Sequence, residues 1–168
     1  MRTREGLDPL AIIARHQATA PVNLDAIAHG LGINVYHESL GPSVSGKITR
    51  DPVKGGPSGF AITINSTEHP NRRRFTLAHE IAHYVLHRDL IERGIVDSTM
   101  YRSELGDYFE IQANRMAAEI LMPTALVRAK YDVQPRPSLA TLARLFQVSE
   151  DAMRIKVRGL NLNQHELF

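Results

Sequence analysis

The spacing of hydrophobic positions changes twice along the chain, and the first part is helical. Leucine and isoleucine recur at helical spacing in residues 8–19, and a second short apolar segment follows in residues 23–30. Asp8 and Asn23 stand at the start of these segments, and both residue types favour the N-cap position because their side chains accept a backbone N–H bond. The pattern predicts two short helices near the N-terminus.

The spacing then changes to a period of two. Residues 33–40, 44–50 and 59–65 are short runs with β-branched residues in which apolar and polar positions alternate. Turns rich in glycine and proline separate them, and this combination is typical of strands that follow one another in a sheet. We predict a small three-stranded antiparallel sheet.

From residue 71 onward the apolar positions return to helical spacing. One helix carries an apolar stripe that begins at Phe75, and a second strong helix is expected over residues 107–121. Further helices are expected over residues 124–131, 139–147 and 150–158. The succession predicts an α+β fold, in which a small sheet packs with a pair of long helices and a helix-turn-helix-like tail follows.

The chain of 168 residues is long enough for one compact domain with a core of its own. The proline-rich segment 134–137 reads as a stiff hinge. We therefore expect a single domain over residues 1–168, with the main core over about 8–132 and a C-terminal helical subdomain over about 135–168.

The absence of cysteine limits the chemistry. It excludes a disulfide framework, a cysteine zinc finger and a thiol nucleophile, so a transition metal would have to be held by histidine, aspartate or glutamate. The formal charge of +2 and the pI near 9.1 permit nucleic-acid binding without requiring it. No signal-peptide pattern and no stretch of about 18 apolar residues is present, so we expect a cytoplasmic protein.

One motif in the first long helix points to a metal. His79, Glu80 and His83 form the pattern H-E-x-x-H. Histidines four residues apart lie on one helical face, where both imidazoles can bind one Zn²⁺, while the glutamate lies beside them and suits a general base. The alternative is a chance string on a solvated helix face, and the histidines do lie away from the main apolar stripe.

A third protein ligand has to come from elsewhere, and Glu110 on the second helix is the favoured carboxylate. Glu119 competes because it lies on the same helix. It is nine residues further on, which turns it roughly 180° around the helix, so both cannot face the metal. Asn114, one turn after Glu110, could hydrogen-bond the free nitrogen of a ligand histidine.

His87 leaves alternatives open. It follows His83 by four residues, but a third ligand from the same helix is sterically awkward because the face has rotated. A packing or capping histidine near the helix C-terminus is the favoured interpretation. Contact with a ligand histidine or with a substrate is the other.

Two blocks, RFTLAHEIAHYVLH and EIQANRMAAEILMP, resemble the ImmA/IrrE family of metallo-endopeptidases in content, order and spacing. The resemblance covers most of residues 8–130. It implies a zincin-like pair of helices, Zn²⁺ held by His79, His83 and Glu110, and Glu80 as the general base. It also implies a protein substrate, a helix-turn-helix repressor often encoded nearby, whose cleavage switches on stress-response or mobile-element genes.

Peptide hydrolysis in such a site needs a group that stabilises the oxyanion. Tyr101 and His87 are the candidates, with Arg102 as a third. The strand predicted over residues 60–65 directly precedes the metal helix, so we expect it to form a cleft edge that pairs with the extended substrate backbone.

Other functions remain open at this stage. The tail over residues 139–158 has helix–turn–helix spacing and positive charge, as in a DNA-binding unit, although its many apolar residues favour packing on the core. The chain could thus be a DNA- or partner-binding regulator with a non-catalytic metal site. A zinc hydrolase that acts on another bond is a third option.

Overall fold

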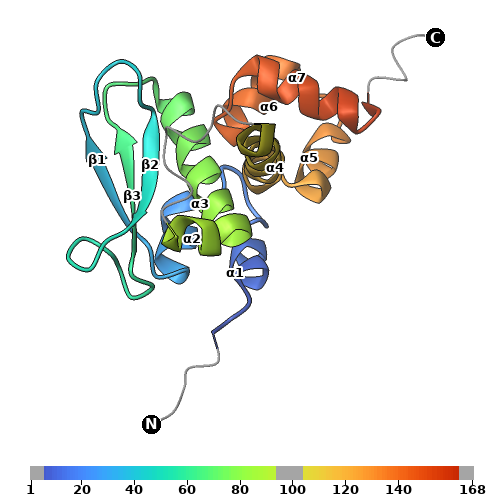
Figure 1. The fold of residues 1–168 in the computed structure, drawn as a ribbon. Helices are drawn as coiled ribbons and strands as arrows, with labels where there is room; N and C mark the ends of the chain where they lie inside the picture. The colour runs from blue at the N-terminus through green and yellow to red at the C-terminus, as the bar shows by residue number, and fades with distance from the viewer. Residues whose placement is uncertain (1–5, 94–103, 163–168) are drawn as a thin grey trace.

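The computed structural model describes residues 6–93 and 104–162. In chain order these residues form α1 (Pro9–Arg15), α2 (Leu24–Gly30), β1 (Asn34–Glu38), β2 (Gly46–Arg50), β3 (Phe60–Asn65), α3 (Pro70–Glu92), α4 (Glu104–Leu121), α5 (Thr124–Tyr131), α6 (Leu139–Phe146) and α7 (Glu150–Gly159). The predicted α+β class is confirmed. The sheet lies on one side of α3, and α4 to α7 lie on the other (Figure 1).

Side-chain caps fix where the shorter helices begin. The carboxylate of Asp8 accepts a hydrogen bond from the Leu10 amide at 3.0 Å, and Asn23 accepts one from Ala26 at 3.0 Å. Ser149 does the same for α7. The caps predicted at Asp8 and Asn23 are therefore confirmed, while α1 ends at Arg15, earlier than the predicted residue 19.

The sheet is mixed, and the antiparallel prediction was wrong in one of its two pairings. The strand order is β1-β3-β2; β2 runs antiparallel to β3, but β1 runs parallel to it. All six residues of β3 are buried, as expected for a central strand. Local alternation identifies strands but not their neighbours, which is why the sequence pattern did not reveal that β1 joins the far side of β3.

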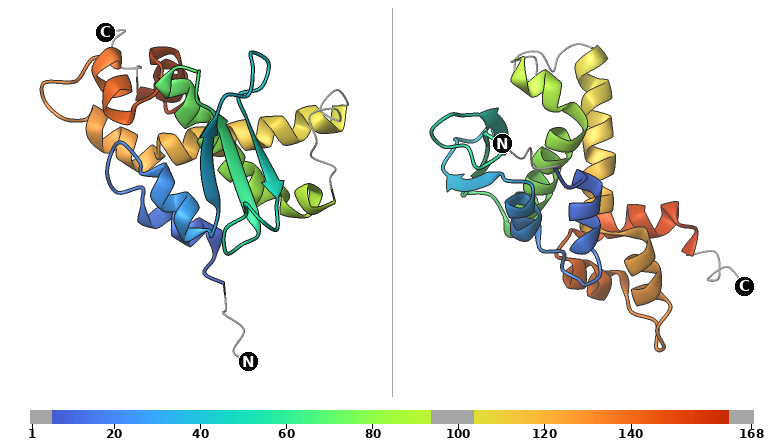
Figure 2. Two further views of the ribbon diagram at one scale, coloured as in Figure 1. Left: turned by 90° about the vertical axis from the view of Figure 1, so that its left-hand side faces the viewer. Right: turned by 90° about the horizontal axis from the view of Figure 1, so that it is seen from below.

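This order also corrects the strand expected to pair with substrate. Because β1 and β2 occupy both edges of β3, residues 60–65 cannot accept a further strand. The strand β2 is an edge strand, and its N-terminal end lies against the first turns of α3, near Arg72 and Thr76. Figure 2 shows the sheet lying across α3 in two further orientations.

The helices α3 and α4 form the centre of the molecule. Small residues at their contact, Ala78, Ala82, Ala113 and Ala117, are fully buried and allow the two backbones to approach closely. The sheet packs on the other side of α3 through Ile62 and Ile64. The close α3–α4 contact is what brings residues 31 positions apart, such as His79 and Glu110, to one place.

The C-terminal helices pack on this core. Phe146, Met153 and Val157 are buried, and the Tyr131 hydroxyl donates to the carbonyl of Leu162 at 3.1 Å. Lys156 on α7 donates to Glu119 on α4. The tail is thus held by the core, in line with the favoured interpretation. Among the described residues, no helix is long and apolar enough to cross a membrane.

Candidate metal centre

Two histidines of α3 point toward α4 from successive turns. His79 and His83 lie four residues apart, so both project from one face, and their Nε2 atoms are 3.0 Å apart. The rings are nearly perpendicular, with centroids 4.5 Å apart. Two ring nitrogens this close leave room for one shared ion between them.

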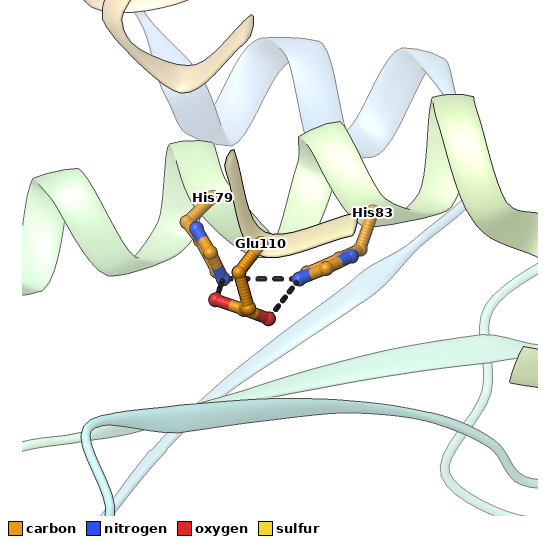
Figure 3. A group of neighbouring side chains, drawn as sticks. All are labelled: His79, His83 and Glu110. Carbon is orange, nitrogen blue, oxygen red and sulfur yellow. Dashed lines mark hydrogen bonds and ion pairs between the residues drawn. The ribbon is translucent and has the colours of Figure 1, made fainter. Parts of the chain in front are cut away.

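Glu110 completes the group from the first half of α4. Its Oε1 atom lies 3.0 Å from Nε2 of His83, and its Oε2 atom lies 3.2 Å from Nε2 of His79 (Figure 3). The three side chains each offer a ligand atom within 4.8 Å of the others. Two histidines and a glutamate are a donor set that catalytic zinc accepts, with one position left for water or substrate. The residues therefore fit a zinc ion.

Glu119, the competing carboxylate, lies elsewhere. Its Oε1 atom accepts the backbone N–H of Thr124 at 2.9 Å, and its Oε2 atom accepts a hydrogen bond from Lys156. The half-turn separation on α4 thus has the expected effect, because Glu110 faces the histidines while Glu119 faces α5 and α7.

The contacts within the group shift its pKa values. Burial raises the pKa of Glu110, but hydrogen bonds from His79 and His83 outweigh burial and lower it to about 2. Burial lowers the pKa of His83. For His79 burial has the same effect, but its contacts with Glu110 prevail and its pKa is raised. An ionised Glu110 and a His83 that favours its neutral form suit metal binding, which requires deprotonated ligands.

Glu80 lies beside these three residues and faces the same cleft. Its side chain lines a cleft of about 640 Å³ together with His79, His83 and Glu110. The residue is only 8% exposed, and burial raises its pKa to about 7. A carboxylate with a pKa near neutrality can both accept and release a proton, which a general base must do.

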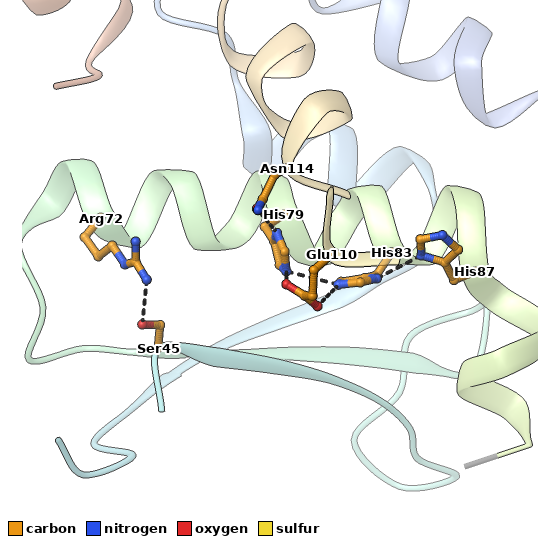
Figure 4. Close-up of polar contacts among 7 residues, drawn as sticks. All are labelled: Ser45, Arg72, His79, His83, His87, Glu110 and Asn114. Carbon is orange, nitrogen blue, oxygen red and sulfur yellow. Dashed lines mark hydrogen bonds and ion pairs between the residues drawn. The ribbon is translucent and has the colours of Figure 1, made fainter. Parts of the chain in front are cut away.

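The outer nitrogens of both histidines have partners (Figure 4). Nδ1 of His79 lies 2.9 Å from Oδ1 of Asn114, the contact expected from the sequence. Nδ1 of His83 lies 2.9 Å from Nδ1 of His87, whose Nε2 lies 2.9 Å from Oε1 of Gln112. The amide of Gln112 in turn donates to the Tyr108 hydroxyl at 3.0 Å.

Gln112 and Tyr108 were missed by the sequence reasoning. They lie four residues apart on α4, and so on one face, but nothing in their pattern indicates that this face meets His87. The only signal was the recurrence of histidine at the same four-residue interval along α3.

His87 lies behind His83 rather than in the cleft. It is 5% exposed, and it has non-helical backbone angles (φ −130°, ψ 24°) at a kink in α3. It lines a separate cavity near Arg88 and Phe109. This position speaks against the candidate role of His87 as oxyanion donor. Its burial agrees with the favoured packing role, and its ring also contacts the candidate ligand His83. Tyr101 and Arg102, the other candidates, lie outside the described residues.

One wall of the cleft comes from the edge of the sheet. Residues 43–46, which lead into and begin β2, line it opposite α3. Arg72 donates to the Ser45 hydroxyl at 3.4 Å, and Ser45 donates to Glu68 at 2.8 Å, which ties the start of β2 to the start of α3. Arg72 was expected to be part of a solvated helix start, and no pattern in the sequence indicates its contact with Ser45.

The fold and this site define a class of protein: an α+β domain with a His-His-Glu group between its two central helices and a further glutamate in the same cleft. Residues 28–158 match the peptidase M78 family, the IrrE N-terminal-like domain, and the chain belongs to this family. The resemblance inferred from the two sequence blocks is therefore confirmed.

Two curated relatives are the radiation response metalloproteases IrrE of Deinococcus radiodurans and Deinococcus deserti. The first is 30% identical over 105 residues, or 56% of this chain and 32% of that protein. The second is 36% identical over 96 residues, or 55% of this chain and 34% of that protein. The chain thus spans about a third of the length of these relatives.

A solved structure supports the fold alone. A Mycobacterium tuberculosis transcriptional regulator superposes with a TM-score of 0.53 at 19% identity, covering 86% of this chain and 44% of the other.

Proposed function

We propose that this chain is a zinc-dependent endopeptidase. One observation carries the proposal: the ligand atoms of His79, His83 and Glu110 converge in a cleft that the buried carboxylate of Glu80 also lines. Membership of a peptidase family and the similarity to two metalloproteases support it. A site for metal storage or structure would not need a second glutamate that stands beside the three ligands rather than among them.

His79, His83 and Glu110 would hold the zinc ion through two Nε2 atoms and the carboxylate. A zinc ion bound there supplies a Lewis acid that activates water and polarises a carbonyl at neutral pH. Asn114 and His87 fix the ring orientation of the two histidines through their Nδ1 atoms.

Glu80 carries out the proton transfers. Its carboxylate accepts the proton of the attacking water and then delivers it to the leaving amine, so the C–N bond breaks without releasing an unprotonated amide anion. The residue returns to its ionised form at the end of each turnover.

The edge strand β2 replaces β3 as the segment that aligns the substrate. The carbonyl of Ser45 accepts from Asn65, and the amide of Asp51 donates to Gly59, so the odd-numbered residues of this strand direct their backbone groups to β3. The alternation of an antiparallel pair then directs those of Gly46 and Ile48 to the open edge. Gly46 also lines the cleft, so an extended substrate can pair there next to the zinc ligands.

For the substrate we propose a helix-turn-helix repressor whose cleavage relieves repression during stress. The support for this part is the family resemblance, together with the printed description of the two relatives as radiation response proteins. It is separable from the chemistry, because another substrate protein would leave the site unchanged.

The test measures bound zinc and peptide cleavage on the same preparations. We expect about one zinc per chain in the wild type, as three ligands and one open position imply. Glu110→Ala should lose most of it. Glu80→Gln should retain the metal but lower cleavage by at least about 100-fold, the usual contribution of a general base. Glu119→Ala is the matched control, since it removes a carboxylate from the same helix and should retain the metal.

The opposite results would reject the proposal. A wild type that stays empty in the presence of zinc has no working metal site. A Glu80→Gln variant that cleaves as fast as the wild type has another base. A wild type that holds zinc but cleaves no protein or peptide would favour the regulator with a non-catalytic site.

DNA binding by the tail is the weaker candidate. Two of the charges that suggested it have partners within the fold, since Lys156 donates to Glu119 and Arg154 donates to Asp151. A gel-shift assay at rising salt tests this directly, because phosphate contacts weaken as salt increases.

A further inference from the structure

A second and larger cavity opens next to the metal cleft. It has a volume of about 990 Å³ and lies between the start of α3, the second half of α4 and the length of α7. Arg72, Phe75 and Asn114 line both it and the metal cleft, so the two spaces adjoin along one shared wall. A polypeptide bound at the metal would pass directly from one into the other.

The floor of this groove is apolar. Phe75, Leu121, Met122 and Val148 line it, together with smaller apolar residues of α4 and α7. Ile155 stands at its rim with 72% of its surface exposed. Ile155 and the apolar floor line the same groove, and a contiguous apolar surface of this kind is typical of an interaction site.

The rim carries positive charge that the fold does not neutralise. Arg72 lies over the Phe75 ring and donates to the Ser45 hydroxyl, but it forms no ion pair with a described carboxylate. Arg115 is exposed and forms no hydrogen bond or ion pair within the described part of the chain. The other rim charges are matched, because Lys156 pairs with Glu119 and Asp151 pairs with Arg154. The unmatched charges therefore favour an occupant with carboxylates.

We propose that this groove binds the substrate polypeptide on one side of the scissile bond, and that it selects an apolar segment flanked by acidic residues. The inference rests on the proposed peptidase function and specifies its substrate class. The volume lies at the upper end for small-molecule pockets, and the shared wall with the metal cleft favours an extended occupant that reaches both spaces. An apolar segment covers Ile155 and the floor, and its acidic flanks meet Arg72 and Arg115.

The first experiment profiles cleavage of a peptide library prepared from a bacterial proteome. We compare the zinc-loaded wild type, Ile155→Glu and the control Val53→Glu, which introduces the same charge at an apolar residue that is 89% exposed. Wild-type cleavage sites should be enriched in apolar residues on one side, with acidic residues beyond them. Ile155→Glu should lower kcat/KM for these peptides about tenfold, within the range for one lost apolar contact. Val53→Glu should match the wild type.

The second experiment measures binding without turnover. A fluorescein-labelled peptide with a leucine-rich centre and glutamate flanks is titrated with Glu80→Gln protein, and its anisotropy gives a Kd. In the Glu80→Gln background, the further substitution Ile155→Glu should raise the Kd about tenfold. Adding the double change Arg72→Glu and Arg115→Glu should also raise it, and should transfer the preference to a peptide with lysine flanks. Adding Val53→Glu should leave the Kd unchanged.

The two experiments separate this inference from the proposed function. In one outcome the wild type cleaves no peptide while Ile155→Glu still weakens peptide binding. That result would support the groove proposal and reject the peptidase function. If the wild type cleaves peptides without apolar enrichment, or Ile155→Glu changes neither cleavage nor Kd, the groove proposal is overturned. It is also overturned if sedimentation shows a dimer that Ile155→Glu dissociates, because a second copy would then occupy the groove.

Discussion

Nδ1 of His87 lies 2.9 Å from Nδ1 of His83, and the two rings are both buried. If Nε2 of His83 directs its lone pair to a metal, its Nδ1 carries the hydrogen and donates to His87. Nε2 of His87 must then carry a hydrogen, which it donates to Gln112. The contact thus sets the tautomer of both rings, and it makes His87 a positioning residue for the candidate metal ligand.

We predict that His87→Phe weakens zinc binding about 10- to 100-fold, the usual effect of removing the outer partner of a ligand histidine. Phenylalanine preserves a ring beside Phe109 but cannot accept the hydrogen of His83. The affinity is measured by competition with a chromophoric chelator. His29→Gln, at an exposed histidine far along the chain from the site, should leave it unchanged. A folded His87→Phe protein with wild-type affinity would show that the contact does not position His83.

The edge of β2 allows a prediction at single-residue resolution. When a peptide that the wild type cleaves binds to Glu80→Gln, the amides of Gly46 and Ile48 should become protected from hydrogen exchange, because they face the open edge. The amides of Lys47 and Thr49 face β3 and should be protected already in the free protein. Exchange followed by NMR distinguishes the two sets. Protection that appears equally on all four, or on none, would contradict substrate pairing at this edge.

Gly46 is required for the approach of β2 to α3. A Cβ atom at this position would lie 2.6 Å from Cγ2 of Thr76 and 3.0 Å from the carbonyl oxygen of Thr63. We therefore expect Gly46→Ala to lower the free energy of unfolding by about 1–3 kcal/mol, as overpacking does. Urea denaturation measures the change.

A second substitution tests the stated cause. Thr76→Ser removes Cγ2 but keeps the hydroxyl that donates to the carbonyl of Arg72 at 2.9 Å. In the Gly46→Ala background it should recover part of the lost stability, although the contact with Thr63 remains. Strictly additive effects of the two changes would show that the methyl contact is not the source of the loss.

The helices and the metal group were predictable for a local reason. The apolar stripes of α3 and α4 and the caps at Asp8, Asn23 and Ser149 depend only on residues that are close together in the sequence. The shared face of His79 and His83 follows from helical geometry alone. The role of Glu110 could not be predicted from helical spacing alone, because its position depends on how α4 packs on α3. The family resemblance indicated this residue as the third ligand.

The remaining features depend on contacts between distant segments. The alternation of apolar and polar residues does not indicate which strand β1 pairs with, so its parallel pairing with β3 could not be predicted. The contact of His87 with Gln112 joins α3 to α4 at the kink in α3, and the groove lies where α7 packs beside α4. No pattern within one element indicates any of these, so they became visible only in the structure.

Glu119 gives a prediction about stability and pH that does not involve the metal. Its carboxylate accepts from the first amide of α5, a helix whose N-cap Pro123 provides no side-chain cap, and it also accepts from Lys156 of α7. Burial raises the pKa of Glu119, but these bonds outweigh burial and the pKa lies below its ordinary value of 4.5. The ionised form therefore stabilises the folded state, and the stabilisation is present above pH 4.5 and is lost as the pH falls through the lowered pKa.

We expect Glu119→Gln to reduce the free energy of unfolding at pH 7 by about 0.5–1 kcal/mol, a modest loss because the side chain is 51% exposed and solvent screens the pair. The difference from the wild type should shrink as the pH falls below 4.5 and also as salt increases at pH 7. Urea denaturation across the pH range measures it. Asp89→Asn is the control, since Asp89 is exposed and has no side-chain partner among the described residues, and it should leave the free energy of unfolding at pH 7 nearly unchanged. A Glu119→Gln loss that persists undiminished in acid would mean that packing, rather than the carboxylate charge, holds α5 and α7 to α4.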